Sequence, residues 1–190
     1  NLEDQNYILL ILSSQILLSS ISVAVFYKIN NLFFSKKISF YGSLLFSFFP
    51  LHVYACAQIS SISLHIFLAL LFYYYFFQII RKKNIFLIIL FSFIAGLLIL
   101  VRREFFAIFV IPVVYLFFFY KIPIKRILLI ILITLVTISP YLVRNFLIFE
   151  KITIQAGFGY NLWKGNNPNA DVSGSLTIDS NLQSKINTVP

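Results

Sequence analysis

The sequence predicts an all-helical integral membrane protein, and three observations lead to that prediction. Of the 190 residues, 60% are hydrophobic and only 11% are charged, whereas soluble domains average about 45–50% apolar and about 25% charged residues. Long apolar runs follow one another with little polar sequence between them. Clusters of basic residues alternate along the connections between these runs. Because a soluble globule of this size cannot cover so much apolar surface, the bilayer is the expected solvent.

About six runs approach the length of about 20 apolar residues that a helix needs to cross a bilayer. The last three runs are short, so tilted, thin or partly embedded helices are expected there. Pro50 is expected to kink or end the second helix. We expect a multi-spanning bundle in residues 1–143 and an extracytoplasmic loop, or the start of a soluble region, in residues 144–190. The six runs are Tyr7–Tyr27, Ser39–Gln58, Ile62–Ile80, Ile85–Val101, Phe105–Tyr120 and Ile127–Val143.

Connections that carry only basic charges alternate along the chain with connections on the other side, whose charges balance. The connections after the first, third and fifth runs hold basic residues and no acidic residue, whereas the charges of the other side balance. The positive-inside rule places the basic connections in the cytoplasm and both chain ends outside, as in a multi-pass protein of the bacterial inner membrane. Topology therefore explains the net charge of +9, and a nucleic-acid partner is not expected. The basic residues of these connections are Lys28, Lys36, Lys37, Arg81, Lys82, Lys83, Lys121, Lys125 and Arg126.

Cysteine and histidine carry little chemistry in this sequence. The single cysteine, Cys56, excludes an intramolecular disulfide. His52 and His65 lie in different runs, and no further ligands have metal-binding spacing, so no metal is expected and both are interpreted as satisfied helix histidines. The chain has no methionine and stops at Pro190 within a polar stretch, which predicts an internal fragment of a longer protein.

Arg102, Arg103 and Glu104 occupy the connection between the fourth and fifth runs, which the charge pattern places outside. Charged residues at a membrane edge are often functional, and the planar guanidinium fork suits phosphate oxygens. A lipid phosphate is therefore a candidate partner. The alternative is a solvated turn in which Arg103 and Glu104 pair internally.

Two further segments carry polar side chains that suit binding. Ser139–Asn145 ends the last run, and its Arg144 either points at a ligand or anchors the helix at the headgroups. The stretch Gly157–Pro168 combines aromatic faces with amide side chains, as sugar sites do, although interfacial aromatics in a turn-rich loop give the same pattern. The candidate cavity residues are Asn145, Tyr160, Asn161, Trp163, Gly165, Asn166 and Asn167.

Taken together, these segments resemble the bacterial family 39 glycosyltransferases, which are related to the protein O-mannosyltransferases and the lipid A aminoarabinose transferase. The resemblance rests on Pro140–Asn145, on Ile152–Ile154 and on the stretch from Gly157 to Pro168. Gly96–Arg102 is similar to the family's Gly-Leu-x-x-Leu-x-Arg segment. Ala170 matches a family alanine, Tyr141 replaces a more usual tryptophan, Arg103 replaces a usual proline, and Ser60-Ser61 replaces a common Ser-Glu pair.

The resemblance implies a GT-C membrane enzyme that transfers a sugar from a polyprenyl-phosphate donor to a lipid, glycan or protein acceptor at the outer face. It implies that Arg102, Arg103 and Arg144 hold the donor phosphate, and that the Gly157–Pro168 loop borders the cavity. The expected catalytic carboxylate lies upstream of Asn1. Glu3 and Asp4 are adjacent and outward, and are either weak candidates for that base or an ordinary N-terminal turn.

Two other function classes stay open. A membrane transporter or lipid flippase would place charges or broken helices at mid-membrane. A non-catalytic assembly subunit of a membrane complex would tolerate alanine at the outer arginines.

Overall fold

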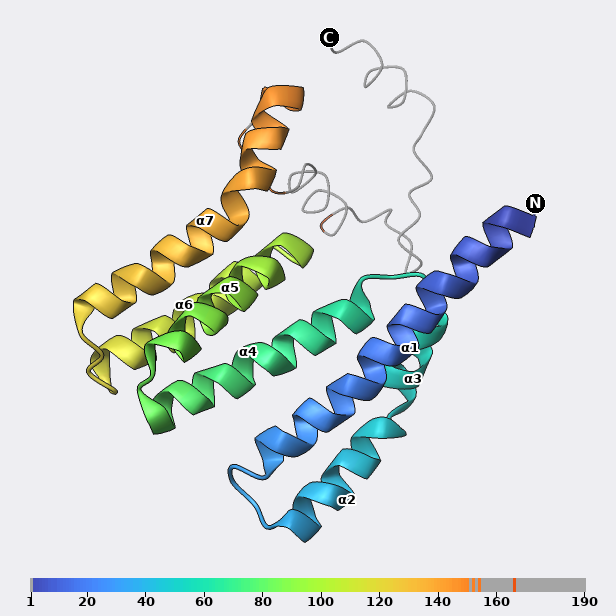
Figure 1. The fold of residues 1–190 in the computed structure, drawn as a ribbon, viewed down its shortest axis with the longest axis horizontal. Coiled ribbons are helices and arrows are strands. Elements are labelled where there is room, and N and C mark those ends of the chain that lie inside the picture. Colours follow the sequence, from blue (N-terminus) through green and yellow to red (C-terminus); the bar gives the residue numbers. More distant parts are fainter. Residues whose placement is uncertain (1, 151, 153, 155–165, 167–190) are drawn as a thin grey trace. The chain divides into compact units, whose positions relative to one another are not determined.

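The computed structural model describes residues 2–150, 152, 154 and 166, with side chains from Asn6 onward. Within this part of the chain the fold is entirely helical, and Asn1–Ile152 belong to one compact unit (Figure 1). The helices are α1 (Leu2–Asn30), α2 (Lys36–Ser47), α3 (Pro50–Ala57), α4 (Ile62–Lys82), α5 (Ile85–Val101), α6 (Phe105–Phe118) and α7 (Ile124–Phe149).

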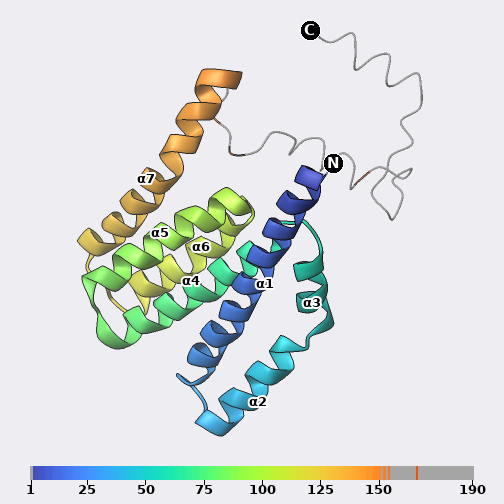
Figure 2. The same ribbon diagram turned by 45° about the vertical axis from the view of Figure 1, so that its right-hand side comes forward.

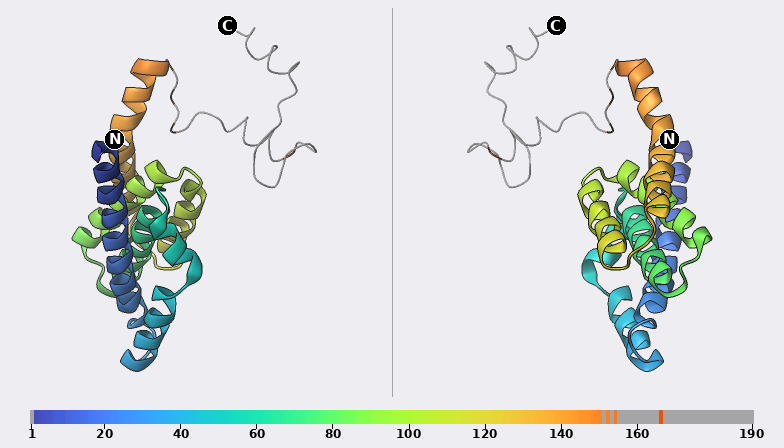
Figure 3. Two further views of the ribbon diagram at one scale, coloured as in Figure 1. Left: turned by 90° about the vertical axis from the view of Figure 1, so that its right-hand side faces the viewer. Right: turned by 90° about the vertical axis from the view of Figure 1, so that its left-hand side faces the viewer.

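Three of these helices, α1, α4 and α7, are long and apolar enough to cross a membrane. The helices α2 and α3 together form a fourth candidate span, bent by 49° at the break between them (Figure 3). Pro50 occupies the first turn of α3, where its missing N–H leaves no helical bond unmade, so the expected effect of this proline is confirmed. The helices α5 and α6, with 17 and 14 residues, fall short of the usual spanning length.

Large apolar side chains are exposed along the outer faces of the helices. Leu10, Leu45 and Leu147 have exposed fractions of 70%, 76% and 75%. An apolar surface that extends over several helices is unfavourable in contact with water but favourable in contact with lipid tails. The exposed faces thus agree with the membrane environment that the composition predicts.

The helix α1 packs on α2, α3 and α4, and α1, α2 and α4 bury small polar side chains. Ser22 of α1, Ser39 and Ser43 of α2 and Ser63 of α4 are all buried. Each of these four hydroxyls donates to a backbone carbonyl within 3.3 Å. Small residues let membrane helices approach closely while their hydroxyls remain bonded, so these four serines are packing residues.

The helix α4 lies between α1 and α5, and α5 continues the layer toward α6 and α7 (Figures 1 and 2). An aromatic core joins α4, α5 and α6. The fully buried Phe72 stacks on Phe91 with ring centroids 4.6 Å apart, and the ring of Phe105 meets Phe72 edge-on at 5.0 Å. These rings hold the short helices α5 and α6 against the long helix α4.

The three basic connections lie at the same end of the bundle. Arg81 donates to the backbone carbonyl of Leu32, and Arg126 Nη1 donates to the carbonyl of Lys83 at 3.1 Å. The Lys83 ammonium lies 4.9 Å from the centre of the Tyr120 ring, whose hydroxyl bonds the carbonyl of Ile80. The structure therefore brings the alternate connections together, as the charge pattern predicts.

The helix α7 extends beyond the predicted end of the last run at Val143. Arg144 and Asn145 are helical, and the helix ends at Phe149, followed by Glu150 in the left-handed conformation with φ of 53°. The expectation that Pro140 and Arg144 mark the end of the helix is thus wrong. Pro140 cannot bond the carbonyl of Val136, but the Ser139 hydroxyl donates to that carbonyl at 2.9 Å, which lets the helix continue. The division at residue 144 otherwise stays a prediction.

Candidate functional site

The helices α5 and α7 run in the same direction and in close contact. The Thr134 hydroxyl donates to the backbone carbonyl of Ser92 at 3.1 Å, across a separation of 42 residues. A Cβ atom built on Gly96 would lie 2.6 Å from the Cβ of Thr137, so the backbone of α5 here touches α7 directly. These two contacts fix the register of the helix pair.

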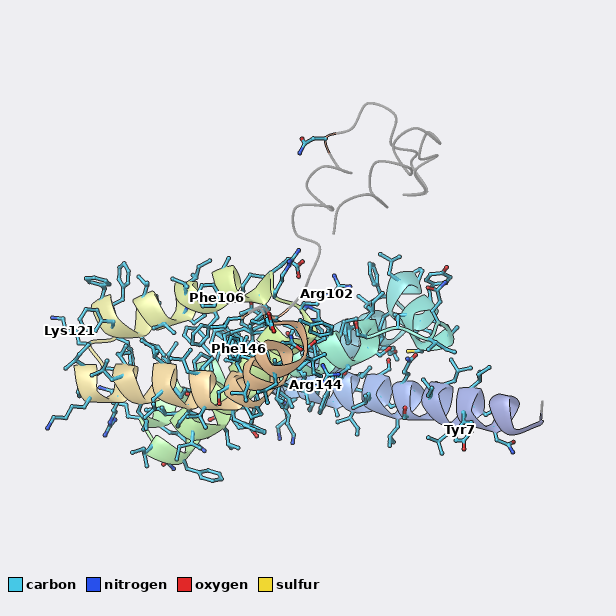
Figure 4. All side chains as sticks on the ribbon, turned by 90° about the horizontal axis from the view of Figure 1, so that it is seen from above. Tyr7, Arg102, Phe106, Lys121, Arg144 and Phe146 are labelled. Carbon is cyan, nitrogen blue, oxygen red and sulfur yellow. The ribbon has the colours of Figure 1, made fainter. Side chains whose placement is uncertain are left out.

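The same register brings Arg102 and Arg144 to one end of the pair. Their separation in the sequence equals the 42 residues that separate Ser92 from Thr134. Arg102 follows the last residue of α5, and Arg144 lies on the last turns of α7. Figure 4 shows both side chains at the ends of their helices, away from Lys121 in the basic connection. Two exposed guanidinium groups therefore lie at the end opposite the basic connections.

The polar residues next to Arg102 and Arg144 in the sequence make an ion pair and a hydrogen bond. Arg103 Nε lies 3.7 Å from Glu104 Oε1, with 21% of the arginine side chain and 70% of the glutamate side chain exposed. This is the internal ion pair that the sequence leaves open as the alternative for Arg103. Arg144 Nη1 donates to Asn145 Oδ1 at 3.2 Å, and Asn145 is 4% exposed. A buried amide thus holds the Arg144 guanidinium, and this orientation favours planar recognition of an anion.

His65 is a third polar group at this end, and the sequence interpretation missed it. Its ring lies edge-on to Phe105 with centroids 6.0 Å apart, and it lies within electrostatic range of Arg102 and Glu104. Its Nδ1 atom is buried and has no hydrogen-bond partner among the described residues. The interpretation of His65 as a satisfied helix histidine is therefore wrong. The sequence could have indicated this role, because His65 lies in the first turn of α4 and only α5 separates α4 from the turn that begins at Arg102.

Other predicted site residues lie outside the part that the structure describes. This holds for the side chains of Glu3 and Asp4, and for several residues of the polar loop. Asn166 is described as an exposed turn residue. Among the described residues, no group of three His, Cys, Asp or Glu side chains could hold a metal ion. The loop residues outside the described part are Tyr160, Asn161, Trp163, Gly165 and Asn167.

Comparison with known proteins adds no further assignment. Neither a protein-family model, nor a curated protein, nor a solved structure matches this chain.

Proposed function

We propose that the chain is part of a membrane glycosyltransferase that uses a polyprenyl-phosphate sugar donor at the extracytoplasmic face of a bacterial inner membrane. The observation that carries this proposal is the common level of Arg102 and Arg144 at one end of the α5–α7 pair. Two exposed guanidinium groups present forked donors to phosphate oxygens. As the sugar leaves, negative charge grows on the phosphate, and fixed cations stabilise that charge.

The membrane face of the bundle offers a place for the prenyl chain. A groove of about 380 Å³ lies between α4 and α6, lined by Tyr73, Phe76, Phe77, Ile80, Ile108, Ile111, Pro112 and Tyr115. Its aromatic and aliphatic walls suit an isoprenoid chain, which carries no hydrogen-bonding group. Both helices also lead toward the end that carries His65 and Arg102. A donor with a charged head and an apolar tail therefore fits this face.

Substitution of Arg102 or Arg144 by alanine in the full-length protein tests the proposal. Loss of one charge-assisted contact costs about 1.5–3 kcal/mol, which corresponds to a loss of roughly 10- to 100-fold. We expect such a decrease in sugar transfer from polyprenyl-phosphate donors in proteoliposomes, and a weaker affinity for a short-chain prenyl phosphate in nanodiscs. Arg126→Ala, at the basic end, is the matched control and is expected to keep both values. Unchanged transfer and affinity in both outer variants would reject the proposal.

A transporter or lipid flippase is the second candidate, because one specific observation favours it. The break between α2 and α3 places the buried His52 on a discontinuous helix, and discontinuous helices with polar side chains are typical of transport sites. Substrate flux across proteoliposomes without sugar transfer would favour this candidate over the transferase.

A further inference from the structure

A buried side-chain pair joins α1 to α3, on helices other than those that carry Arg102 and Arg144. Ser19 Oγ and His52 Nε2 are 2.6 Å apart, and the two residues are 7% and 4% exposed. Ser19 lies within α1, and His52 lies in the first turn of α3 after the break. A serine hydroxyl within hydrogen-bond reach of an imidazole nitrogen is the geometry of a nucleophile and its base.

Ser19 differs from the other described serines of α1. Ser13, Ser14, Ser20 and Ser22 each donate to a carbonyl three or four residues earlier in the helix, at 2.7–2.9 Å. This is the usual way for a serine in a membrane helix to satisfy its hydroxyl. Ser19 instead bonds the ring of His52. Its hydroxyl is therefore placed for proton exchange with a titratable group.

The pair opens onto a groove of about 400 Å³ between α1, α2 and α3. No charged residue lines this groove, and its apolar walls include Ile16, Val23 and Val53. The opposite ring atom, His52 Nδ1, is buried without a partner among the described residues. When Nδ1 carries the ring proton, Nε2 accepts the hydrogen bond from Ser19 and is then the base. The groove suits an uncharged, lipid-soluble molecule, and a serine nucleophile would attack a carbonyl carbon of such a molecule.

We propose that Ser19 and His52 form a nucleophile–base pair that cleaves an uncharged ester within the membrane. Ser19 Oγ forms a bond to the ester carbonyl carbon while its proton moves to His52 Nε2. The bond between that carbon and the alcohol oxygen then breaks, and the leaving alcohol takes the proton from Nε2. Water next attacks the acyl-serine and passes a proton to Nε2. The acid is released, and Ser19 recovers its proton. This activity does not depend on sugar transfer or on the arginine end.

An alkyl fluorophosphonate tests the pair, because it reacts covalently with activated serines. We expect the full-length protein in nanodiscs to carry the probe on Ser19, as located by tandem mass spectrometry, and the Ser19→Ala variant to lose it. A general base contributes about 10²–10⁴-fold, so we expect His52→Ala to slow the labelling by at least about 100-fold. Ser22→Ala is the matched control, since Ser22 is buried on α1 but bonds Leu18, and it should label at the wild-type rate.

Two results would overturn the proposal: absence of the probe from wild-type Ser19, or equal labelling rates with and without His52. If His52→Ala does not fold, as judged by circular dichroism, His52→Asn replaces it. The decisive wild-type experiment needs neither variant. Because the probe contains no sugar or prenyl phosphate, its result is independent of the transferase proposal.

Discussion

Gly96 is the residue at which the backbone of α5 packs directly against the Thr137 side chain and the Thr134 carbonyl of α7. A Cβ atom at this position would lie 2.6 Å from Thr137 Cβ, 2.7 Å from Thr137 Cγ2 and 3.2 Å from the Thr134 carbonyl. All three atoms belong to α7, which packs closely on α5. The close packing of α7 against the α5 backbone therefore requires a glycine here, and Gly96 sets the spacing of the pair that carries Arg102 and Arg144.

Gly96→Ala is expected to lower the free energy of unfolding by about 1–3 kcal/mol, the usual effect of overpacking a tight contact. Denaturant titration of the full-length protein in mixed micelles measures this change. Gly42→Ala is the matched control, because a Cβ there would meet only Asn30 Nδ2, at an ordinary 3.5 Å. It should leave stability equal or slightly higher, since alanine favours the helix. Equal effects of the two substitutions would contradict the tight contact at Gly96.

Among the helices, α7 shows how a proline is accommodated inside a span. Pro140 removes the N–H that would bond the carbonyl of Val136, and the hydroxyl of Ser139 takes that place. The helix then continues far enough to include Arg144 and Asn145. Without such compensation an unpaired carbonyl in the membrane costs several kcal/mol.

A double-mutant cycle separates this compensation from an ordinary serine contact. In the native background, Ser139→Ala is expected to destabilise the protein by about 1 kcal/mol, because the Val136 carbonyl loses its partner. In the Pro140→Ala background the new backbone N–H bonds that carbonyl, so Ser139→Ala should have almost no effect. Unfolding in mixed micelles gives all four values. Equal losses in both backgrounds would mean that the hydroxyl does not replace the proline's missing bond.

Helices were largely predictable from the sequence, because apolar runs and basic connections are strong local signals. The fourth run, Ile85–Val101, coincides with α5, and the break at Pro50 was expected. The end of α7 was not predictable in the same way, because compensation by Ser139 depends on a side-chain rotamer. The proximity of His65 to Arg102, and that of Ser19 to His52, depends on packing between helices, which periodicity alone does not determine. The interpretation of His65 was consequently wrong, whereas His52 has one ring nitrogen bonded to Ser19.

At the scale of the whole molecule, the charge pattern and the side-chain contacts both distinguish a basic end of the bundle from the end that carries Arg102. The basic connections meet through Arg81, Lys83 and Arg126, and the Arg102 turn lies at the other end of α5. We propose that the basic end faces the cytoplasm, since basic residues are retained on that side.

Single cysteines in a Cys56→Ser background test this topology. Cysteine at Asn31, Lys83 or Lys121 should be shielded from a membrane-impermeant maleimide in intact cells and become reactive after permeabilisation. Cysteine at Ile59 or Glu104 should react without permeabilisation. The positions of each set lie in connections of the same end, so mixed behaviour within a set would refute the proposed alternation.

The short helices α5 and α6 also have a consequence for the surrounding lipid. At about 1.5 Å per residue, their 17 and 14 residues extend about 25 Å and about 21 Å, against a hydrocarbon thickness of about 30 Å. Where both helices cross the bilayer, we expect the leaflets around this pair to thin, at a modest elastic cost for each ångström. We expect headgroups and water to dip toward Arg102, so that a lipid-linked phosphate reaches the arginine without leaving its leaflet. The hydrophobic mismatch itself would then bring the donor and the protein to the same depth.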